Sequence, residues 1–372
     1  MQYLEYKHGI RLSRLGMGNM RLPVRAEVEG NPIDYDKAKA IIDRAMAMGV
    51  NYYDTAYIYH GGKSEEFTGR ALAEYPRDSY YVADKFNLDA EPDYRRQFAE
   101  QLRRLNMERI DFYLLHGVMD HNVETFLTNG CLEYFDEMKA QGKIRFFGFS
   151  FHGTPAALRR MTAARDWDFV QIQLNYYDWL YGDARELYEI LAGAGIPIMV
   201  MEPVRGGLLA KLNDAGKRIL AQAHPERSLA SWALRWVKAL EGVQVVLSGM
   251  SDVSQLEENA ATFSDESLFT PGEQALIEKA AEALRTSVSV PCTGCRYCVD
   301  GCPAGLNIPR LLAAYNEAKL DGAWRLTTLK DLPEEKLPGA CIGCGACTGH
   351  CPQSIDVPDC MQKLADMLNP RG

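Results

Sequence analysis

The stretch GVNYYDTAYIYH, residues 49–60, contains the pattern that decides the fold of most of this chain. A stretch with helical periodicity, residues 37–48, comes before it, and its apolar residues on one face are Ala38, Ile41, Ile42 and Ala45. Gly49 follows as a C-terminal stop signal, as expected of a helix end. Residues 51–54, NYYD, then read as a short β-strand that ends in a carboxylate.

The same alternation of short β-rich runs and amphipathic stretches recurs along the first 285 residues. Eight alternations favour an α/β fold of the (β/α)8 (TIM) barrel type over an open doubly wound sheet. The expected strands are residues 14–18, 51–54, 80–85, 110–117, 144–150, 168–174, 196–201 and 243–249. Residues 2–15 read as a β-hairpin that turns at His8-Gly9, and we expect it to cap the barrel floor.

Composition and charge narrow the class of protein. The chain has 372 residues, 47% of them hydrophobic and 24% charged, which is an ordinary globular mixture. Its net charge of −9 argues against broad attraction to nucleic acid or anionic lipid. Residues 1–9 lack the apolar core of a signal peptide, and the longest apolar runs are too short to cross a bilayer. We therefore expect a cytoplasmic protein with no nucleic-acid or membrane partner.

Eight of the ten cysteines lie in two short runs, CTGCRYCVDGCP at 292–303 and CIGCGACTGHCP at 341–352. Both runs have the spacing C-x2-C-x2-C-x3-C-P, in which three thiolates surround one cubane and the fourth points toward a second cluster. The pattern predicts two 4Fe–4S clusters. Cluster one would be held by Cys292, Cys295, Cys298 and Cys351, and cluster two by Cys341, Cys344, Cys347 and Cys302.

Structural zinc is the alternative for these cysteines. Tetrahedral zinc sites usually combine two separate C-x2-C pairs, which three evenly spaced thiolates plus a fourth suit poorly. Two complete copies, each followed by proline, favour clusters. Cys131 and Cys360 lie outside the pattern, and we expect ordinary thiols there.

The cysteine runs resemble those of dicluster 4Fe–4S ferredoxins. The connection between them has helical periodicity, as in the all-helical ferredoxin modules attached to larger redox enzymes. The composition changes near residues 286–291, so we expect a barrel domain at 1–285 and a smaller, mainly α-helical ferredoxin-like domain at 286–372. The apolar residues at helical spacing are Ile308, Leu311, Leu312, Tyr315, Met361, Leu364 and Leu368.

Reactive side chains of a (β/α)8 barrel lie at the C-terminal ends of its strands. Asp54 ends the second expected strand, Lys85 the third, and His116 lies at the end of the fourth. Tyr59 follows Asp54 by five residues. Taken singly, each has a structural explanation, such as a turn cap, a solvated strand end or rim packing. Together, the four predict one ionisable site at the barrel mouth.

The segment GVNYYDTAYIYHGGKSEEFTGRAL, residues 49–72, resembles the signature of the aldo/keto reductase family, and the likeness extends over about residues 10–262. The resemblance implies that Asp54, Tyr59, Lys85 and His116 form a catalytic tetrad. Tyr59 would be the acid/base, Lys85 would lower the pKa of its phenol, Asp54 would position Lys85, and His116 would orient the carbonyl. A barrel of this family with a ferredoxin-like tail resembles a known branch of it.

The resemblance also implies contacts to a nicotinamide ring. Ser150 and Gln171 match family positions that bind the carboxamide. Phe151 stands where the family usually has asparagine, and Met201 stands where an aromatic side chain often stacks on the ring.

For the rest of the dinucleotide, Glu258 and Asn259 match positions that contact adenine. Gly249 and Gln255 stand where basic residues usually bind the 2′-phosphate, so NADH and NADPH both stay open as the cofactor. Arg205 is a candidate for phosphate binding, with a simple glycine turn at Gly206-Gly207 as the alternative.

We expect an oxidoreductase that interconverts a small-molecule carbonyl and its alcohol with NAD(P)H, and whose clusters connect it to a redox partner protein. Two alternatives stay open. The chain could be an iron–sulfur electron carrier whose barrel is a docking scaffold and no longer reduces carbonyls, because fold alone does not establish catalysis. The clusters could also stabilise the tail only, as structural metals do.

Overall fold

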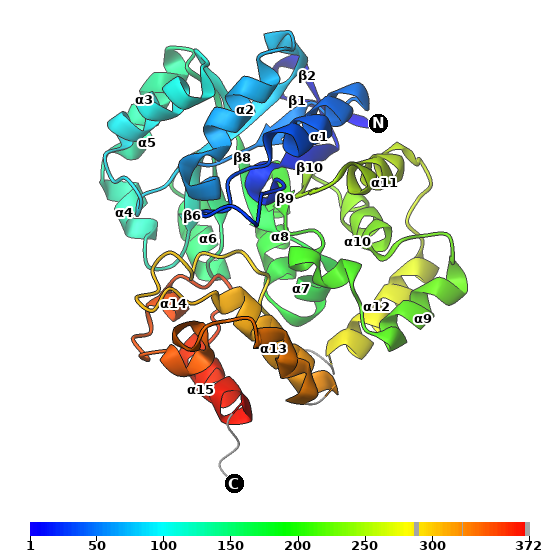
Figure 1. Ribbon diagram of the computed structural model, residues 1–372. Coiled ribbons are helices and arrows are strands. Elements are labelled where there is room, and N and C mark those ends of the chain that lie inside the picture. Colours follow the sequence, from blue (N-terminus) through cyan, green and yellow to red (C-terminus); the bar gives the residue numbers. More distant parts are fainter. Residues whose placement is uncertain (286–289, 322, 369–372) are drawn as a thin grey trace. The chain divides into compact units, whose positions relative to one another are not determined.

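The computed structural model describes residues 1–285, 290–321 and 323–368, which form two compact units (Figure 1). The first unit comprises Met1–Pro203 and Ala230–Pro271, and the second comprises Val204–Leu229 and Gly272–Gly372. Part of the predicted boundary segment, residues 286–289, lies outside the described residues. The division between residues 285 and 286 stays a prediction.

Eight parallel strands of the first unit close into a barrel in the order β10-β3-β4-β5-β6-β7-β8-β9. Each lies within two residues of an expected strand at both ends, so the predicted (β/α)8 barrel is confirmed. The strands are β3 (Leu15–Gly18), β4 (Tyr52–Asp54), β5 (Tyr81–Phe86), β6 (Ile110–Val118), β7 (Ile144–Phe151), β8 (Phe169–Gln173), β9 (Ile198–Met201) and β10 (Val243–Ser248).

The predicted N-terminal hairpin is also confirmed. Strands β1 (Tyr3–Tyr6) and β2 (Ile10–Ser13) pair antiparallel around His8, whose φ of 60° is left-handed. The ring of Tyr6 lies 5.6 Å from Phe112 and 5.0 Å from Phe146, both in the barrel interior. The hairpin therefore closes the end of the barrel at which the strands begin, and leaves the other end for a site.

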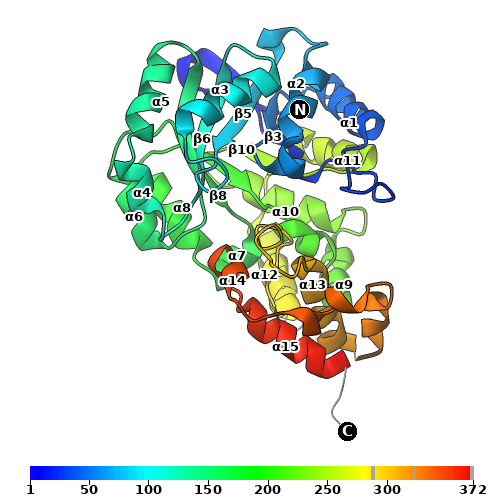
Figure 2. The same ribbon diagram turned by 60° about the vertical axis from the view of Figure 1, so that its left-hand side comes forward.

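Helices alternate with the barrel strands (Figure 2). The first of them buries the predicted apolar face, Ala38, Ile41, Ile42 and Ala45. In the first unit they are α1 (Tyr35–Ala47), α2 (Ser64–Leu72), α3 (Tyr94–Leu105), α4 (Val123–Thr128), α5 (Cys131–Ala140), α6 (Pro155–Thr162), α7 (Tyr176–Tyr181), α8 (Ala184–Gly193), α10 (Leu229–Lys238) and α11 (Val253–Ser264).

The second unit is helical, as predicted for the C-terminal part of the chain. Its helices are α9 (Asp214–Ala223), α12 (Pro271–Arg285), α13 (Ile308–Asp321), α14 (Ala346–Gly349) and α15 (Val357–Leu368). A core that α13, α14 and α15 share buries six of the predicted apolar residues, Ile308, Leu311, Leu312, Tyr315, Met361 and Leu364, with Leu368 partly buried beside them. Over the described ranges, none of the helices combines the length and the apolar character needed to span a bilayer.

Helices α2 and α3 approach each other most closely at Gly69. A Cβ atom on this residue would lie 2.1 Å from the carbonyl oxygen of Leu105. We expect Gly69→Ala to lower the free energy of unfolding by about 2–3 kcal/mol, because backbone must move to admit one methyl group. Urea denaturation measures this change.

Gly193→Ala is the matched control, because Gly193 is exposed at the end of α8 and nothing lies within 4 Å of its Cβ position. This variant should gain about 0.5 kcal/mol from the reduced entropy of the unfolded chain. Equal stabilities of the two variants would contradict the close approach at Gly69.

Candidate active site and cluster sites

Lys85 lies at the centre of a buried group at the C-terminal ends of β4 and β5. Its ammonium donates to Asp54 Oδ1 at 2.6 Å, to the Thr55 carbonyl at 2.7 Å and to the Tyr59 hydroxyl at 3.4 Å. The Lys85 side chain is 1% exposed and that of Asp54 is 4% exposed. The three N–H groups of this ammonium therefore all have partners, and one of them is a phenol.

Tyr59 and His116 complete this group. Tyr59 begins the 3-10 turn Tyr59–Gly62 after β4 and is 8% exposed. Its ring meets the imidazole of His116, on β6, edge to face with centroids 5.8 Å apart. Residues from three consecutive strands and one following turn thus lie together, and their catalytic roles stay a prediction.

Burial sets the electrostatics of the site. It raises the pKa of Asp54, although the Lys85 cation acts in the opposite direction. It lowers the pKa of His116 well below the ordinary value, and the charges of Lys85 and His152 lower it further. It also lowers the pKa of His152 to about 4. The imidazole of His116 is therefore uncharged at neutral pH and can donate a hydrogen bond from only one nitrogen.

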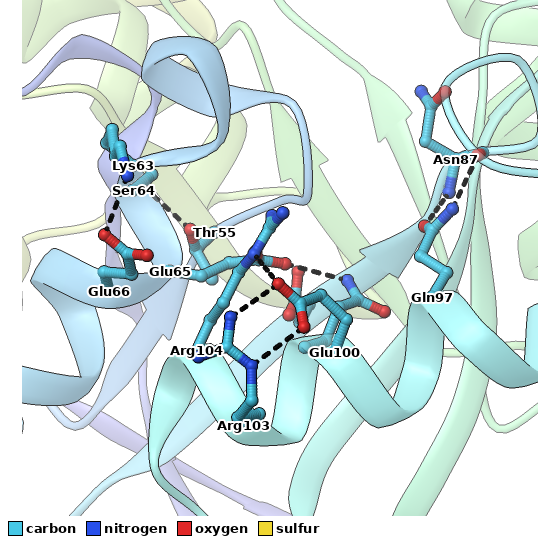
Figure 3. Close-up of polar contacts among 12 residues, drawn as sticks. Thr55, Lys63, Ser64, Glu65, Glu66, Asn87, Gln97, Glu100, Arg103 and Arg104 are labelled. Atoms are coloured by element: carbon cyan, nitrogen blue, oxygen red, sulfur yellow. Dashed lines mark hydrogen bonds and ion pairs between the residues drawn. The ribbon is translucent and has the colours of Figure 1, made fainter.

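Polar side chains behind the barrel wall hold the backbone of Lys85. Gln101, on α3, donates from Nε2 to the Lys85 carbonyl and to Glu65 Oε1, each at 3.0 Å. Asp84 Oδ1 accepts from the Lys85 N–H at 2.8 Å. Arg104 reaches from α3 to α2 and donates to Glu65 Oε2 at 2.8 Å (Figure 3). These residues were missed by sequence reasoning, because the contacts join positions up to 39 residues apart.

The imidazole of His116 has a similar support. Asn87 Nδ2 lies 3.4 Å from His116 Nδ1. The backbone of Asn87 is bonded in both directions to the amide of Gln97, at 2.6 Å and 2.8 Å (Figure 3). Helix α3 therefore fixes the neighbours of both Lys85 and His116.

The residues predicted to bind the nicotinamide lie at the ends of β7, β8 and β9. Ser150 Oγ accepts from the Gly117 N–H at 2.9 Å. Gln171 Nε2 donates to Met201 Sδ at 3.6 Å, and its buried Oε1 has no hydrogen-bond partner among the described residues. A buried acceptor without a donor suits a carboxamide N–H group. Phe151, at the end of β7, is buried.

The four residues predicted near adenosine are spread around β10 and α11. Asn259 Nδ2 donates to Ser248 Oγ at 3.1 Å, and Glu258 is exposed. Gln255 Oε1 accepts from the Ser251 N–H at 2.9 Å. A Cβ atom on Gly249 would lie 3.2 Å from the Arg21 side chain. The aliphatic part of the Arg21 side chain therefore lies beside Gly249, and its guanidinium pairs with Glu202 Oε1 at 3.8 Å.

Arg205, the remaining predicted cofactor residue, belongs to the second unit. It is 3% exposed, and its Nη2 donates to Gln353 Oε1 at 3.1 Å. Its predicted contact with phosphate stays a prediction.

The eight patterned cysteines line two cavities in the second unit. Cys292, Cys295, Cys298 and Cys351 line one cavity, and Cys302, Cys341, Cys344 and Cys347 line the other. Each set combines three cysteines of one run with the fourth of the other run, which is the arrangement expected for two cubanes. Within the described part of the chain, no three His, Cys, Asp or Glu side chains group closely enough to hold a single metal ion. The four thiols of each set line a cavity and are not gathered around the position of a single ion.

The Cys298 thiol of the first cavity does not ionise readily without a nearby cation. Burial and the charges of Cys295, Cys292 and Cys351 raise the pKa of Cys298 to about 12. A bound metal centre reverses this preference, because it stabilises thiolate directly. Cys131, outside the pattern, is buried in the barrel, where burial raises its pKa to about 12. Cys360 is likewise buried.

Comparison with known proteins gives matches over both parts of the chain. The model of the aldo/keto reductase family matches residues 14–282, and that of a 4Fe–4S dicluster domain matches residues 291–355. L-galactose dehydrogenase from Arabidopsis thaliana is 27% identical over 282 residues, which cover 69% of this chain and 86% of that protein. NADH-specific methylglyoxal reductase from Escherichia coli (strain K12) is 26% identical over 326 residues, which cover 74% and 96%.

Solved structures give the same result. The holo form of an aldo-keto reductase from Bacillus halodurans superimposes with a TM-score of 0.63 and 26% identity, covering 76% of this chain and 97% of that one. An aldo-keto reductase from Klebsiella pneumoniae in complex with NADPH shares the fold, with a TM-score of 0.61 and 20% identity over 75% and 94% of the two chains. The chain therefore belongs to the aldo/keto reductase family of oxidoreductases, and it carries a 4Fe–4S dicluster domain in its C-terminal part.

Proposed function

We propose that the barrel interconverts a carbonyl and an alcohol on a small-molecule substrate with NAD(P)H. The observation that carries this proposal is the shared ammonium of Lys85, which is bonded at once to the Asp54 carboxylate and the Tyr59 hydroxyl. A phenol with an ordinary pKa near 10 is a poor proton donor at neutral pH. A cation 3.4 Å from the phenol stabilises phenolate and makes the proton easier to release.

In the reductive direction, Tyr59 donates its proton to the carbonyl oxygen as negative charge develops there. Asp54 and the Thr55 carbonyl hold the Lys85 ammonium in place, so the cation does not need to be reoriented during the step. In the oxidative direction, the same phenolate accepts the proton of the alcohol.

His116 orients the carbonyl as an uncharged donor, because its lowered pKa excludes the imidazolium at neutral pH. The nicotinamide, when bound, supplies or accepts the hydride. Gln171 Oε1 would accept from its carboxamide, and Ser150 lies on the neighbouring strand β7. Both NADH and NADPH are candidates. The Escherichia coli relative is named as NADH-specific, whereas the solved structure from Klebsiella pneumoniae is a complex with NADPH.

We propose that the second unit holds two 4Fe–4S clusters, on the two cysteine sets that line its cavities. Cubanes exchange one electron at a time, whereas a nicotinamide transfers two together as hydride. The clusters would therefore exchange electrons with a redox partner protein in single steps.

A second candidate function is electron carriage with the barrel as a docking scaffold. Phe151 and Met201 favour it, because they differ from the residues usual at these positions of a nicotinamide site. Binding of NADH or NADPH by the purified protein distinguishes the two functions. Micromolar binding of either nucleotide supports the reductase. Failure of both NADH and NADPH to bind supports the carrier.

Tyr59→Phe tests the acid role directly. We expect the variant to lose about 100-fold or more of its NAD(P)H-dependent carbonyl reduction, because phenylalanine has no proton to donate. Its iron content should equal that of the wild type. Tyr3→Phe removes a phenol that bonds the Gly49 carbonyl at the hairpin, and it should keep full turnover. Unchanged turnover in Tyr59→Phe, with a panel of aldehydes and ketones, would refute the proposed chemistry.

The lowered pKa of His116 predicts the shape of the pH profile. Because burial lowers the pKa of His116 well below its ordinary value, this group should add no ionisation between pH 6 and 8. We expect His116→Gln to lower kcat/KM while the profile of kcat/KM keeps its shape over this range. The loss of an ionisation between pH 6 and 8 in the variant would show that His116 is protonated there instead.

Iron and sulfide analysis after anaerobic purification tests the clusters. We expect about eight iron and about eight sulfide per chain, from two cubanes of four each. Cys295→Ser should lower the iron content toward half, because serine is a weaker ligand for the cluster. Cys131→Ser, whose thiol lies outside the cysteine runs in α5, should leave it unchanged. Bound zinc without sulfide in the wild type would support the structural-zinc alternative.

A further inference from the structure

The segment that follows β9 in the chain belongs to the same compact unit as the cysteine runs. It begins with the 3-10 turn Arg205–Ala210, which starts four residues after β9 ends, and it continues to Leu229. In a (β/α)8 barrel, a segment after a strand ordinarily serves the barrel's own site. Here its contacts include both stretches of chain that supply thiols to the cavity predicted to hold cluster one.

The first of these contacts is at Gly206. A Cβ atom on Gly206 would lie 1.8 Å from the carbonyl oxygen of Thr293, and the φ of Gly206 is 64°. Thr293 is the residue after Cys292. Only glycine therefore allows the turn to lie against the backbone of the first cysteine run.

The second contact is at Arg205. Its guanidinium donates to the side chain of Gln353, two residues after Cys351, and Gln353 lines the cavity of cluster one. Arg205 and Cys292 also line one cavity of about 440 Å³. The guanidinium therefore contacts a side chain that lines the cluster-one cavity. Arg205 is 3% exposed, so it is largely shielded from water.

We propose that Arg205 is a positioning residue of the cluster-one site that raises the reduction potential of that cluster. Reduction adds one electron, hence one negative charge, to the cubane. A buried cation stabilises the reduced form more than the oxidised form, because screening by water is weak there. Arginine suits this role, since its planar guanidinium carries the cation and donates the hydrogen bond to Gln353 Oε1.

Other cations differ from Arg205 in exposure or in placement. Arg296 lines the same cluster cavity but is exposed, and Lys211, on the same segment as Arg205, is also exposed. Lys336 lies near the other cavity, where its ammonium donates to the Ala304 carbonyl at 2.8 Å. We therefore expect Arg205 to act on cluster one and to leave cluster two unchanged.

The test is an anaerobic redox titration of the holoprotein followed by electron paramagnetic resonance, with the two signals assigned through a Cys344→Ser variant that perturbs cluster two. In Arg205→Gln, the equilibrium constant for one-electron reduction of cluster one should fall about tenfold or more, which is a shift of about 59 mV or more to lower potential. In Arg205→Lys, which keeps the charge, it should stay within about threefold of the wild type. The signal of cluster two should not move in either variant.

Lys211→Gln is the matched control, because it removes an equal charge from an exposed position of the same segment. In this variant, the equilibrium constant for one-electron reduction of either cluster should change by less than about twofold. Gln353→Glu is a second route to the same effect, since a carboxylate beside Arg205 neutralises its cation. It should lower the cluster-one potential in the same direction, and it decides the question if Arg205→Gln binds too little iron.

The inference rests on the proposed iron–sulfur clusters and not on carbonyl reduction. Absence of iron from the wild type would refute the clusters themselves. Iron-loaded Arg205→Gln or Gln353→Glu with both potentials unchanged would refute the role of Arg205 alone. A shift of equal size in Lys211→Gln would also refute it, because the effect would then follow net charge rather than the buried site.

Discussion

The buried ion pair between Lys85 and Asp54 constrains the barrel mouth more than any other contact described there. A charged ammonium that is 1% exposed would destabilise the fold strongly if it lost its partner. Asp54 and the Thr55 carbonyl satisfy two of its protons, and the third reaches Tyr59. The same geometry that makes the lysine tolerable inside the barrel therefore places a cation beside a phenol. Stability and the proposed chemistry depend on one hydrogen-bonding arrangement.

Sequence patterns predicted the parts of this structure that depend on local order. Strand positions, the hairpin at His8, and the candidate residues at strand ends follow from periodicity and from the rule that parallel strands share a C-terminal edge. The two cysteine sets followed from spacing alone. The support of Lys85 by Gln101 could not be predicted, because nothing in the sequence near Gln101 reports which backbone carbonyl its amide will meet.

The contacts of Arg205, and of the segment that begins with it, could not be predicted from the sequence either. Its position after β9, followed by two glycines, suggested a phosphate contact in the barrel. The structure places its bond at Gln353, 148 residues later in the chain. Composition cannot distinguish these cases, since an arginine followed by glycines suits an anion and a backbone contact equally well. The close approach of Gly206 to Thr293 is a second contact with the cysteine runs that no sequence pattern predicts, while the phosphate contact of Arg205 stays a prediction.

Buried charge is balanced in different ways at the two candidate sites. In the barrel, the chain supplies both signs itself, so the charges of Lys85 and Asp54 balance each other without a bound group. In the second unit, the groups described around the first cavity include four thiols, and burial together with the charges of the other three raises the pKa of Cys298 to about 12. Thiolates in that cavity need an added positive centre, which couples metal binding to the local fold. The proposed role of Arg205 follows from the same electrostatics. A buried guanidinium beside that cavity stabilises the negative charge that the metal centre does not neutralise, and the reduced cluster carries more of this charge than the oxidised cluster.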